Sequence, residues 1–338
     1  MTSAKVADKN LILAGDIGGT KTHLALFSCR EGKLRAEARE LFPSKKFPGL
    51  EPMLEKFLAN RKASIEGACF GIAGPVVDGQ VKTTNLPWLV DAKKLAATLK
   101  FKAVSLLNDL EAAAYGIFTL EPAEVISLNE GSIRRPGNKT LIAAGTGLGE
   151  AYLYDDGRDY HPSASEGGHA DFAPRNDTEI GLLRYLLKKF GHASYERVLS
   201  GPGLFNIYDF FREDGGLEEP GWLKEKIAAA VDASAVITQS ALSGDSEICV
   251  KALDLFASVY GAEAGNLALR GKAVGGVYVG GGIAPKILDK LKGGAFMRAF
   301  VDKGRYADFL SAIPVKVVLN QETALQGAAY YAAFRSHG

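Results

Sequence analysis

Cysteine is scarce in this chain, and the cysteines it has are far apart. Cys29, Cys69 and Cys249 are the three cysteines among 338 residues. An odd number of scattered cysteines fits neither a disulfide framework nor a zinc site, because both need cysteines at paired spacings. We therefore expect a protein of a reducing compartment, the cytoplasm.

The sequence also lacks an excess of either charge and a long apolar run. Lys and Arg number 40 against 39 Asp and Glu, and this near balance excludes a global field that attracts nucleic acid or an anionic membrane. No run of about 18 apolar residues exists to span a bilayer, and the polar start MTSAKVADKN is too short for a signal peptide. We expect a soluble protein with no nucleic-acid or membrane partner.

What the chain does have is apolar residues and glycine. Hydrophobic residues make up 47% of the chain, enough to bury sizeable cores. Its length predicts two domains, at roughly 100–200 residues per domain. The 39 glycines predict places where the backbone turns tightly or approaches a ligand closely, since glycine inside regular elements costs stability.

Two segments share one pattern of strand, glycine-rich turn and strand. Residues 11–27 read LILAG-DIGGTKT-HLALF, and residues 140–154 read TLIAA-GTGLGE-AYLY. Each predicts a β-hairpin, and the repetition predicts an internal duplication. Strands and helices alternate between the two hairpins, which predicts an α/β architecture. We place a small α/β domain at residues 11–119 with 320–338, and a large domain at residues 120–319.

Helical periodicity dominates the second half of the chain. It predicts helices over 179–190, 194–199, 222–235 and 247–270, with Ser200-Gly201-Pro202-Gly203 ending the second of them. Residues 275–291 predict a short buried strand, a triple glycine and a helix with Pro285 in its first turn. A last strand over 313–320 and a last helix over 322–335 follow, and this helix is expected to pack back onto the first domain.

The turn Asp16-Ile17-Gly18-Gly19-Thr20 ends the first predicted strand. Its glycines let backbone N–H groups crowd a phosphate, while the Asp16 carboxylate suits Mg²⁺ or its waters. An ordinary hairpin turn is the alternative. A P-loop is excluded because Thr20 replaces its second glycine and a strand follows instead of a helix. The second turn, Gly145 to Gly149, lacks the GxGxxG spacing of a Rossmann fingerprint.

Three further motifs each allow a functional and a structural interpretation. Asn108-Asp109 follows a strand, where a carboxylate can accept a hydroxyl proton, but either residue can merely cap the next helix. Glu166 and His169 in the sequence EGGH are suitable partners for vicinal sugar hydroxyls, or are simply a solvated glutamate and a structural histidine. Gly280-Gly281-Gly282 can hold an adenine or ribose flat against the backbone, or can form a close turn between strand and helix.

Taken in order, DIGGT, LLND, AAGTGLG, EGGH, ERVLSGPGLFNIY and VGGGIAP resemble the bacterial glucokinase family of the hexokinase/actin-like ATPase superfamily. The resemblance runs from about Leu11 to the C-terminal helix. It implies a two-lobed actin-like ATPase (ribonuclease H-like) fold, with a smaller α/β lobe, a larger helix-rich α+β lobe and a cleft between them. It also implies ATP and Mg²⁺ as cofactors, D-glucose as substrate, and a homodimer.

The resemblance assigns roles to individual residues. Asp109 is similar to the family's catalytic base, and Asp16 to a metal-binding residue that acts through water. The implied sugar-binding residues are Asn85, Asn108, Asp109, Glu166, His169 and Glu196. The implied nucleotide-binding residues are Asp16, Ile17, Gly18, Gly19, Thr20, Lys21, Thr22, Gly145, Thr146, Gly147, Gly280, Gly281 and Gly282.

The chain departs from the family pattern at Lys21-Thr22-His23, where many members have an Asn-Ala-Arg type of sequence. The related repressor/ORF/kinase family shares DIGGTK but carries a cysteine-rich zinc motif after its histidine. No cysteine lies between Cys69 and Cys249, so His169 is a candidate sugar ligand and not a zinc ligand.

The resemblance therefore implies ATP-dependent phosphorylation of glucose at its 6-hydroxyl. Two alternatives remain open. The first is a kinase for another hexose or an amino sugar, or one that takes polyphosphate as donor. The second is a non-catalytic, sugar-responsive regulator that acts through DNA. The ten residues before the first strand leave no room for a helix-turn-helix, and the balanced charge also disfavours it.

Overall fold

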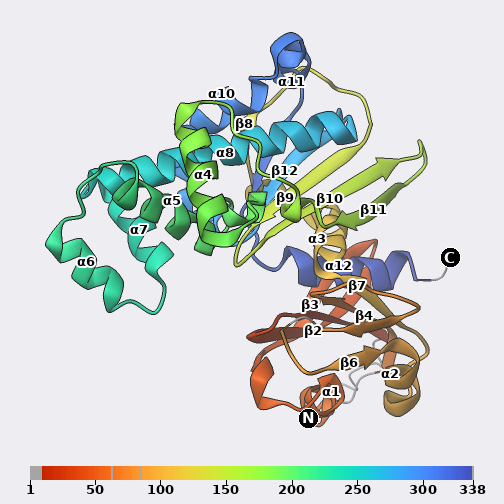
Figure 1. Cartoon of the computed structure of the whole chain (residues 1–338). Helices are drawn as coiled ribbons and strands as arrows, with labels where there is room; N and C mark the ends of the chain where they lie inside the picture. Colours follow the sequence, from red (N-terminus) through yellow and green to blue (C-terminus); the bar gives the residue numbers. More distant parts are fainter. Residues whose placement is uncertain (1–9, 62–63, 84, 337–338) are drawn as a thin grey trace, which may run out of the picture. The chain divides into compact units, whose positions relative to one another are not determined.

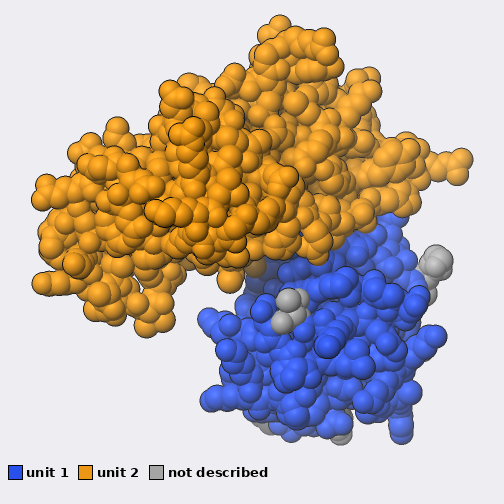
Figure 2. Space-filling view, in the orientation of Figure 1, with its two compact units in different colours: residues 1–121, 322–338 blue, residues 122–321 orange. Residues whose placement is uncertain are grey.

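The chain folds into two compact units. The computed structural model describes residues 10–61, 64–83 and 85–336. Unit 1 comprises residues 1–121 with 322–338, and unit 2 comprises residues 122–321 (Figures 1 and 2). The C-terminal helix belongs to unit 1. Among the described residues, no helix combines the length and the apolar character needed to cross a membrane.

Unit 1 is built on a five-stranded sheet of order β3-β2-β1-β4-β7. β1, β2 and β3 are antiparallel neighbours, whereas β1, β4 and β7 run parallel. The strands of the unit are β1 (Asn10–Ile17), β2 (Lys21–Arg30), β3 (Lys33–Pro43), β4 (Ser64–Ile72), β7 (Val104–Asn108) and the separate pair β5 (Gln80–Lys82) and β6 (Leu89–Asp91). The first predicted hairpin is confirmed as β1 and β2.

Helices cover both faces of this sheet. Successive residues of a strand point to opposite faces, and alternate residues of β1 are buried in two different cores. Leu11 and Leu13 belong to a core that includes Phe57 of α1, and Ile12 and Ala14 to a core that includes Ala328 of α12. The helices of unit 1 are α1 (Leu50–Leu58), α2 (Ala92–Leu99), α3 (Asp109–Gly116) and α12 (Thr323–Phe334), with 3-10 turns η1 (Ser44–Lys46) and η2 (Ile117–Thr119).

Unit 2 repeats this topology. Its sheet has the order β11-β10-β9-β12-β13-β8. β9, β10 and β11 are antiparallel neighbours, and β9, β12 and β13 run parallel, as β1, β4 and β7 do in unit 1. The predicted duplication is therefore confirmed at the level of strand order. The strands are β8 (Val125–Asn129), β9 (Lys139–Ala144), β10 (Leu148–Asp155), β11 (Tyr160–Ser165), β12 (Gly276–Gly280) and β13 (Val315–Val318).

Helices make up most of the rest of unit 2, and the 25-residue helix α8 lies at their centre (Figure 1). Its buried residues, such as Phe256 and Tyr260, join one large core with α5, α10 and the sheet. The helices are α4 (Asp177–Phe190), α5 (Gly201–Glu213), α6 (Gly221–Ala228), α7 (Ala233–Ser243), α8 (Glu247–Gly271), α9 (Leu288–Lys292), α10 (Ala295–Val301) and α11 (Ala307–Ser311). The 3-10 turns are η3 (Pro122–Glu124), η4 (Gly167–His169), η5 (Tyr195–Arg197), η6 (Ala284–Ile287) and η7 (Gly304–Tyr306).

Two predicted helices have other bounds in the structure. The segment predicted as one helix over 222–235 is divided between α6 (Gly221–Ala228) and α7 (Ala233–Ser243). A helix over 194–199 was predicted to end at Ser200-Gly201-Pro202-Gly203, but the structure has a short 3-10 turn there and starts α5 at Gly201. The Ser200 hydroxyl accepts a hydrogen bond from Gly203 N at 3.0 Å. Serine as N-cap with proline in the first turn is a typical helix start, so the same four residues begin a helix and do not end one.

Candidate active site

The parallel strands of unit 1 end at one edge of the sheet. Ile17 of β1 pairs with Ile72 of β4, and Ile72 pairs with Asn108 of β7. The residues that follow these strands therefore lie together, at the strand ends where open α/β sheets bind ligands. The turn after β1 and Asp109, the first residue after β7, are brought to this edge.

The turn Asp16 to Thr20 is fixed by its own backbone and by Ser44. Gly18 N donates to Lys21 O at 3.0 Å, and the Ser44 hydroxyl donates to Gly18 O at 2.7 Å. Ser44 N donates to Thr20 O at 3.0 Å. Thr20 and Lys21 are exposed. The loop is thus preorganised and presents a hydroxyl and an ammonium group to solvent, as phosphate binding requires.

Two of the predicted nucleotide-binding side chains point inward instead. Ile17 is buried in the core of unit 1. Thr22 is fully buried, and its hydroxyl is hydrogen-bonded to the Ser44 hydroxyl at 2.9 Å. The Thr22 side chain therefore supports the loop from within, and its assignment to the nucleotide stays a prediction.

Asn85 lies against the same loop. It is exposed, and a Cβ placed on Gly19 would be 2.6 Å from Asn85 Cβ. Only glycine allows this approach without a shift of the neighbouring residue. The predicted sugar-binding residue and the predicted phosphate loop are therefore neighbours in unit 1.

Asn108 and Asp109 have different local roles. The side-chain oxygen Oδ1 of Asn108 caps α3 by accepting hydrogen bonds from Leu110 N at 2.9 Å and Glu111 N at 3.4 Å. The side-chain nitrogen Nδ2 of Asn108 donates to Gly74 O at 3.2 Å. Asn108 is therefore the N-cap of α3, because its Oδ1 already accepts hydrogen bonds from the first turn of the helix. Asp109 Oδ1 accepts from Leu110 N at 3.0 Å, and the residue is only partly buried.

Asp16 and Asp109 form an electrostatic pair at the strand ends. Burial, followed by the negative charge of Asp109, raises the pKa of Asp16 to about 6. Two carboxylates and nearby backbone are the hard oxygen donors that Mg²⁺ accepts, with the remaining ligands supplied by water and phosphate oxygens. Among the residues described, no three His, Cys, Asp or Glu side chains gather into a metal site of their own. The residues present fit a cation shared with a substrate phosphate.

The second predicted phosphate loop and the triple glycine meet in unit 2. Gly281, with φ +81°, lies so close to β9 that a Cβ there would be 2.3 Å from Ala144 O. The buried Tyr260 hydroxyl accepts from Ala144 N at 3.2 Å and is 3.2 Å from Gly280 O. The exposed Thr146 and the turn at Gly145 are therefore joined to Gly280–Gly282 through one tyrosine of α8.

The EGGH loop and Glu196 also converge in unit 2. His169 Nε2 lies 3.9 Å from Glu166 Oε2, and His169 Nδ1 lies 4.0 Å from Glu196 Oε1. Glu196 Oε2 accepts from Leu148 N at 3.0 Å, within the turn Gly145 to Gly149. Glu166 and His169 are largely exposed, so their hydrogen-bonding groups are available to a polyhydroxylated ligand.

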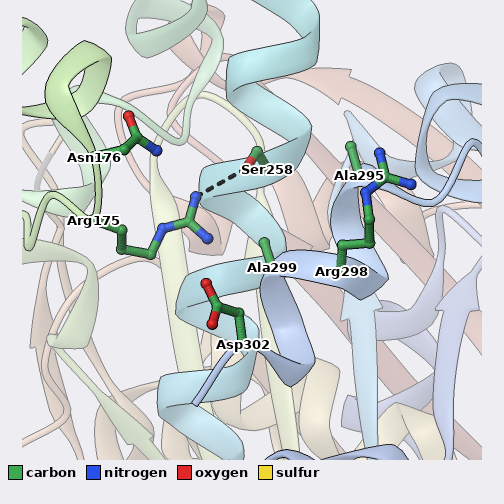
Figure 3. Close-up of a pocket in the computed structure, with 7 residues that line it drawn as sticks. All are labelled: Arg175, Asn176, Ser258, Ala295, Arg298, Ala299 and Asp302. Carbon is green, nitrogen blue, oxygen red and sulfur yellow. Dashed lines mark hydrogen bonds between the residues drawn. The ribbon is translucent and has the colours of Figure 1, made fainter. Parts of the chain in front are cut away.

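Two hollows in unit 2 are lined by residues other than the predicted site residues. The first, of about 460 Å³, includes Arg175 and Ser258 (Figure 3). Its Arg175 guanidinium is already paired with the buried Glu179 and donates to the Ser258 hydroxyl at 2.8 Å. This guanidinium is therefore already used within the protein. The second, of about 370 Å³, includes Tyr195, next to Glu196.

Two residues that hold these loops, Ser44 and Tyr260, carry no signal in the local sequence. Ser44 lies in an otherwise unremarkable FPSKK segment, and Tyr260 has the helical spacing of a core aromatic. Neither is next in sequence to the loop it supports, so no local pattern indicates its role.

The chain is similar to known proteins over nearly its whole length. The family model described as glucokinase matches residues 13–335. The glucokinase of Nostoc sp. is 44% identical over 338 residues, which cover 96% of this chain and 99% of that protein. A crystal structure of a glucokinase from an Antarctic psychrotroph is 31% identical with a TM-score of 0.84, covering 96% of this chain and 99% of that one.

A more distant structure shares the fold. The ROK family glucokinase from Streptomyces griseus, solved in complex with glucose and AMPPNP, is 22% identical with a TM-score of 0.62 and covers 96% of this chain and 99% of its own. The actin-like ATPase fold expected from the sequence is confirmed. With a family match over nearly the whole length and a full-length relative at 44% identity, this chain belongs to the glucokinase family.

Proposed function

We propose that this protein transfers the γ-phosphoryl group of ATP to the 6-hydroxyl of D-glucose, with Asp109 as general base. One observation carries the proposal: the Asp109 carboxylate lies at the end of β7, on the same sheet edge as the preorganised Asp16–Thr20 loop. A base beside a phosphate loop is the arrangement that phosphoryl transfer to a hydroxyl needs.

The chain's own residues position the substrates and move one proton. The backbone and hydroxyls of the loops at 16–20 and 145–147 bind phosphate oxygens, and Gly280–Gly282 holds the adenosine. Asp109 accepts the 6-hydroxyl proton as the oxygen attacks the γ-phosphorus. When bound at Asp16, directly or through water, Mg²⁺ supplies neutralisation of the β- and γ-phosphate charge.

Unit 2 provides the groups for sugar recognition. Glu166, His169 and Glu196 offer acceptors and donors for the remaining hydroxyls, and Asn85 and the free amide hydrogen of Asn108 contribute from unit 1. A hydroxyl left unpaired in such a site weakens binding strongly, so these groups select among hexoses. Binding of the sugar is expected to exclude water from the γ-phosphate.

We also propose the domain division at residues 11–119 with 320–338 and 120–319, a cytoplasmic location and a homodimer. These follow from the family and from the composition of the chain. A gel-shift assay at moderate salt distinguishes the DNA-binding alternative, for which the balanced charge gives no support.

Substitution of the base tests the proposal. Asp109→Ala is expected to lower kcat by at least about 10²-fold, the lower range for loss of a general base. Glucose binding, measured by equilibrium dialysis, is expected to survive in part because the groups of unit 2 are unchanged. Asp156→Asn, at an exposed loop carboxylate in unit 2, is the matched control. Near-normal turnover in Asp109→Ala contradicts the assignment.

A further inference from the structure

Two buried carboxyl groups face each other behind the EGGH loop of unit 2. Glu150 of β10 and Glu263 of α8 are both 0% exposed. Glu263 is ion-paired with Arg270 and accepts from the Asn266 amide at 2.8 Å. Both carboxyl oxygens of Glu150 are buried, and no donor within the described part of the chain reaches them.

Protonation of Glu150 removes the cost of burying a second negative charge next to Glu263. A buried carboxylate without donors is costly, and a second negative charge next to Glu263 adds to the cost. When Glu150 is protonated, its O–H donates to the Glu263 carboxylate and one proton is shared by the pair. Burial, followed by the charge of Glu263, raises the pKa of Glu150 to about 8, with Arg270 opposing the shift.

Glu150 is in direct contact with the EGGH loop. A Cβ placed on Gly167 would be 2.1 Å from Glu150 Oε2, so the loop backbone lies against the carboxyl group. The Ser165 hydroxyl donates to Glu150 O at 3.2 Å and accepts from Gly167 N at 3.2 Å. A displacement of the Glu150 carboxyl therefore moves Gly167, which lies between Glu166 and His169.

Glu263, the other carboxyl group of the pair, is linked through Asn266 to the segment that contains Glu196. The Asn266 amide that donates to Glu263 also donates to the Tyr195 hydroxyl at 3.1 Å. Tyr195 is buried and immediately precedes Glu196. The carboxyl pair thus lies between the two segments that bring the sugar-binding groups of unit 2 together.

We propose that Glu150 is a positioning residue for sugar binding. In its protonated form, hydrogen-bonded to Glu263, it holds the EGGH loop and the Glu196 segment in the arrangement that binds the sugar. This inference rests on the proposed function, because it assigns the sugar to these two segments. Glu150 itself does not touch the substrate.

A dependence on pH follows from this position. Ionisation of Glu150 places two negative charges against a single arginine, and their repulsion displaces Gly167. The ionisable groups around the pair are Glu263, Tyr260 and Arg270 of α8, Tyr152 of β10, Tyr195 of η5, and Lys303 after α10. Burial raises the pKa values of the three tyrosines, which favours their neutral forms. The pKa of Lys303 is lowered by burial, which makes it the group to control for.

The test compares KM for glucose, KM for ATP and kcat between pH 6.5 and pH 9.5. In the wild type, KM for glucose is expected to rise above about pH 8, by up to about tenfold per pH unit, while KM for ATP stays within about twofold. Glu150→Gln keeps a donor toward Glu263 and cannot ionise. Its KM for glucose is expected to stay flat and within about twofold of the wild-type value at pH 7. Lys303→Gln, the matched control, is expected to keep the wild-type rise.

The outcomes separate this inference from the proposed function. An equal alkaline rise in Glu150→Gln, or a parallel loss of kcat and of affinity for both substrates, overturns the positioning role. A wild-type KM for glucose that is flat up to pH 9.5 overturns it without any variant, even if Glu150→Gln does not fold. Absence of glucose phosphorylation by the wild type at pH 7 contradicts the proposed function instead.

Discussion

Removal of one hydroxyl from the core of unit 2 is expected to affect both stability and nucleotide binding. Tyr260 is fully buried on α8, and its hydroxyl accepts from Ala144 N at 3.2 Å. The same oxygen is 3.2 Å from Gly280 O and 3.3 Å from Ile142 O, so it has carbonyl partners to which it can donate. Tyr260→Phe keeps the ring in place and leaves the Ala144 N–H buried without an acceptor.

The magnitude follows from that unsatisfied donor. A buried polar group that loses its partner costs about 1–3 kcal/mol of the free energy of unfolding. For a domain of this size, each kcal/mol lowers Tm by about 2–4 °C. Because Ala144 and Gly280 border the second phosphate loop and the triple glycine, KM for ATP is expected to rise while KM for glucose changes less.

Thermal unfolding and steady-state kinetics measure these effects. Tyr208→Phe is the matched control, because Tyr208 is also fully buried and its hydroxyl donates to Glu219 at 2.7 Å, a residue outside the phosphate loops. It is expected to lose stability without a change in KM for ATP. If Tyr260→Phe unfolds at the wild-type temperature and binds ATP normally, the role assigned to this hydroxyl is refuted.

Two further predictions concern the first phosphate loop. The raised pKa of Asp16, about 6, means that its carboxylate is lost as pH falls through this value, so kcat/KM for ATP should fall below pH 6. Because the folded pKa lies above the unfolded one, this group's contribution to stability is present at low pH and lost as pH rises through 6. Asp16→Asn should therefore be more stable than the wild type at pH 8 yet inactive, and a lower Tm would contradict this. Ser44→Ala removes the hydroxyl that is hydrogen-bonded to the Thr22 hydroxyl and to Gly18 O. It should lower the free energy of unfolding, measured in urea, by about 1–3 kcal/mol and raise KM for ATP. An unchanged KM for ATP would show that Ser44 does not fix the loop.

The most predictable part of the fold is the pair of glycine-rich hairpins. Apolar runs on either side of a tight turn are a local signal, and a repeated local signal predicts a repeated topology, which the two sheets have. Ser200-Gly201-Pro202-Gly203 was ambiguous because serine and glycine occur at both helix starts and loops. Only the hydrogen bond from Gly203 N to the Ser200 hydroxyl distinguishes the two.

The supports of the site could not be predicted from local patterns. Thr22 is adjacent to the loop in sequence, but its burial depends on Ser44, which lies 22 residues away. Glu150 has the position of an ordinary strand residue, and only the packing of α8 against the sheet places Glu263 opposite it. Contacts between residues far apart in the sequence leave no trace in composition or periodicity, whereas a glycine-rich turn does.

The central claim is tested most directly by one assay of the purified wild-type protein. ADP release is measured with ATP and Mg²⁺ across a panel of glucose, mannose, fructose, galactose and glucosamine, with polyphosphate as alternative donor. We expect turnover with glucose and ATP, formation of glucose 6-phosphate, and no transfer from polyphosphate. Turnover with another sugar at a higher kcat/KM than glucose, or no transfer to any sugar, contradicts the account.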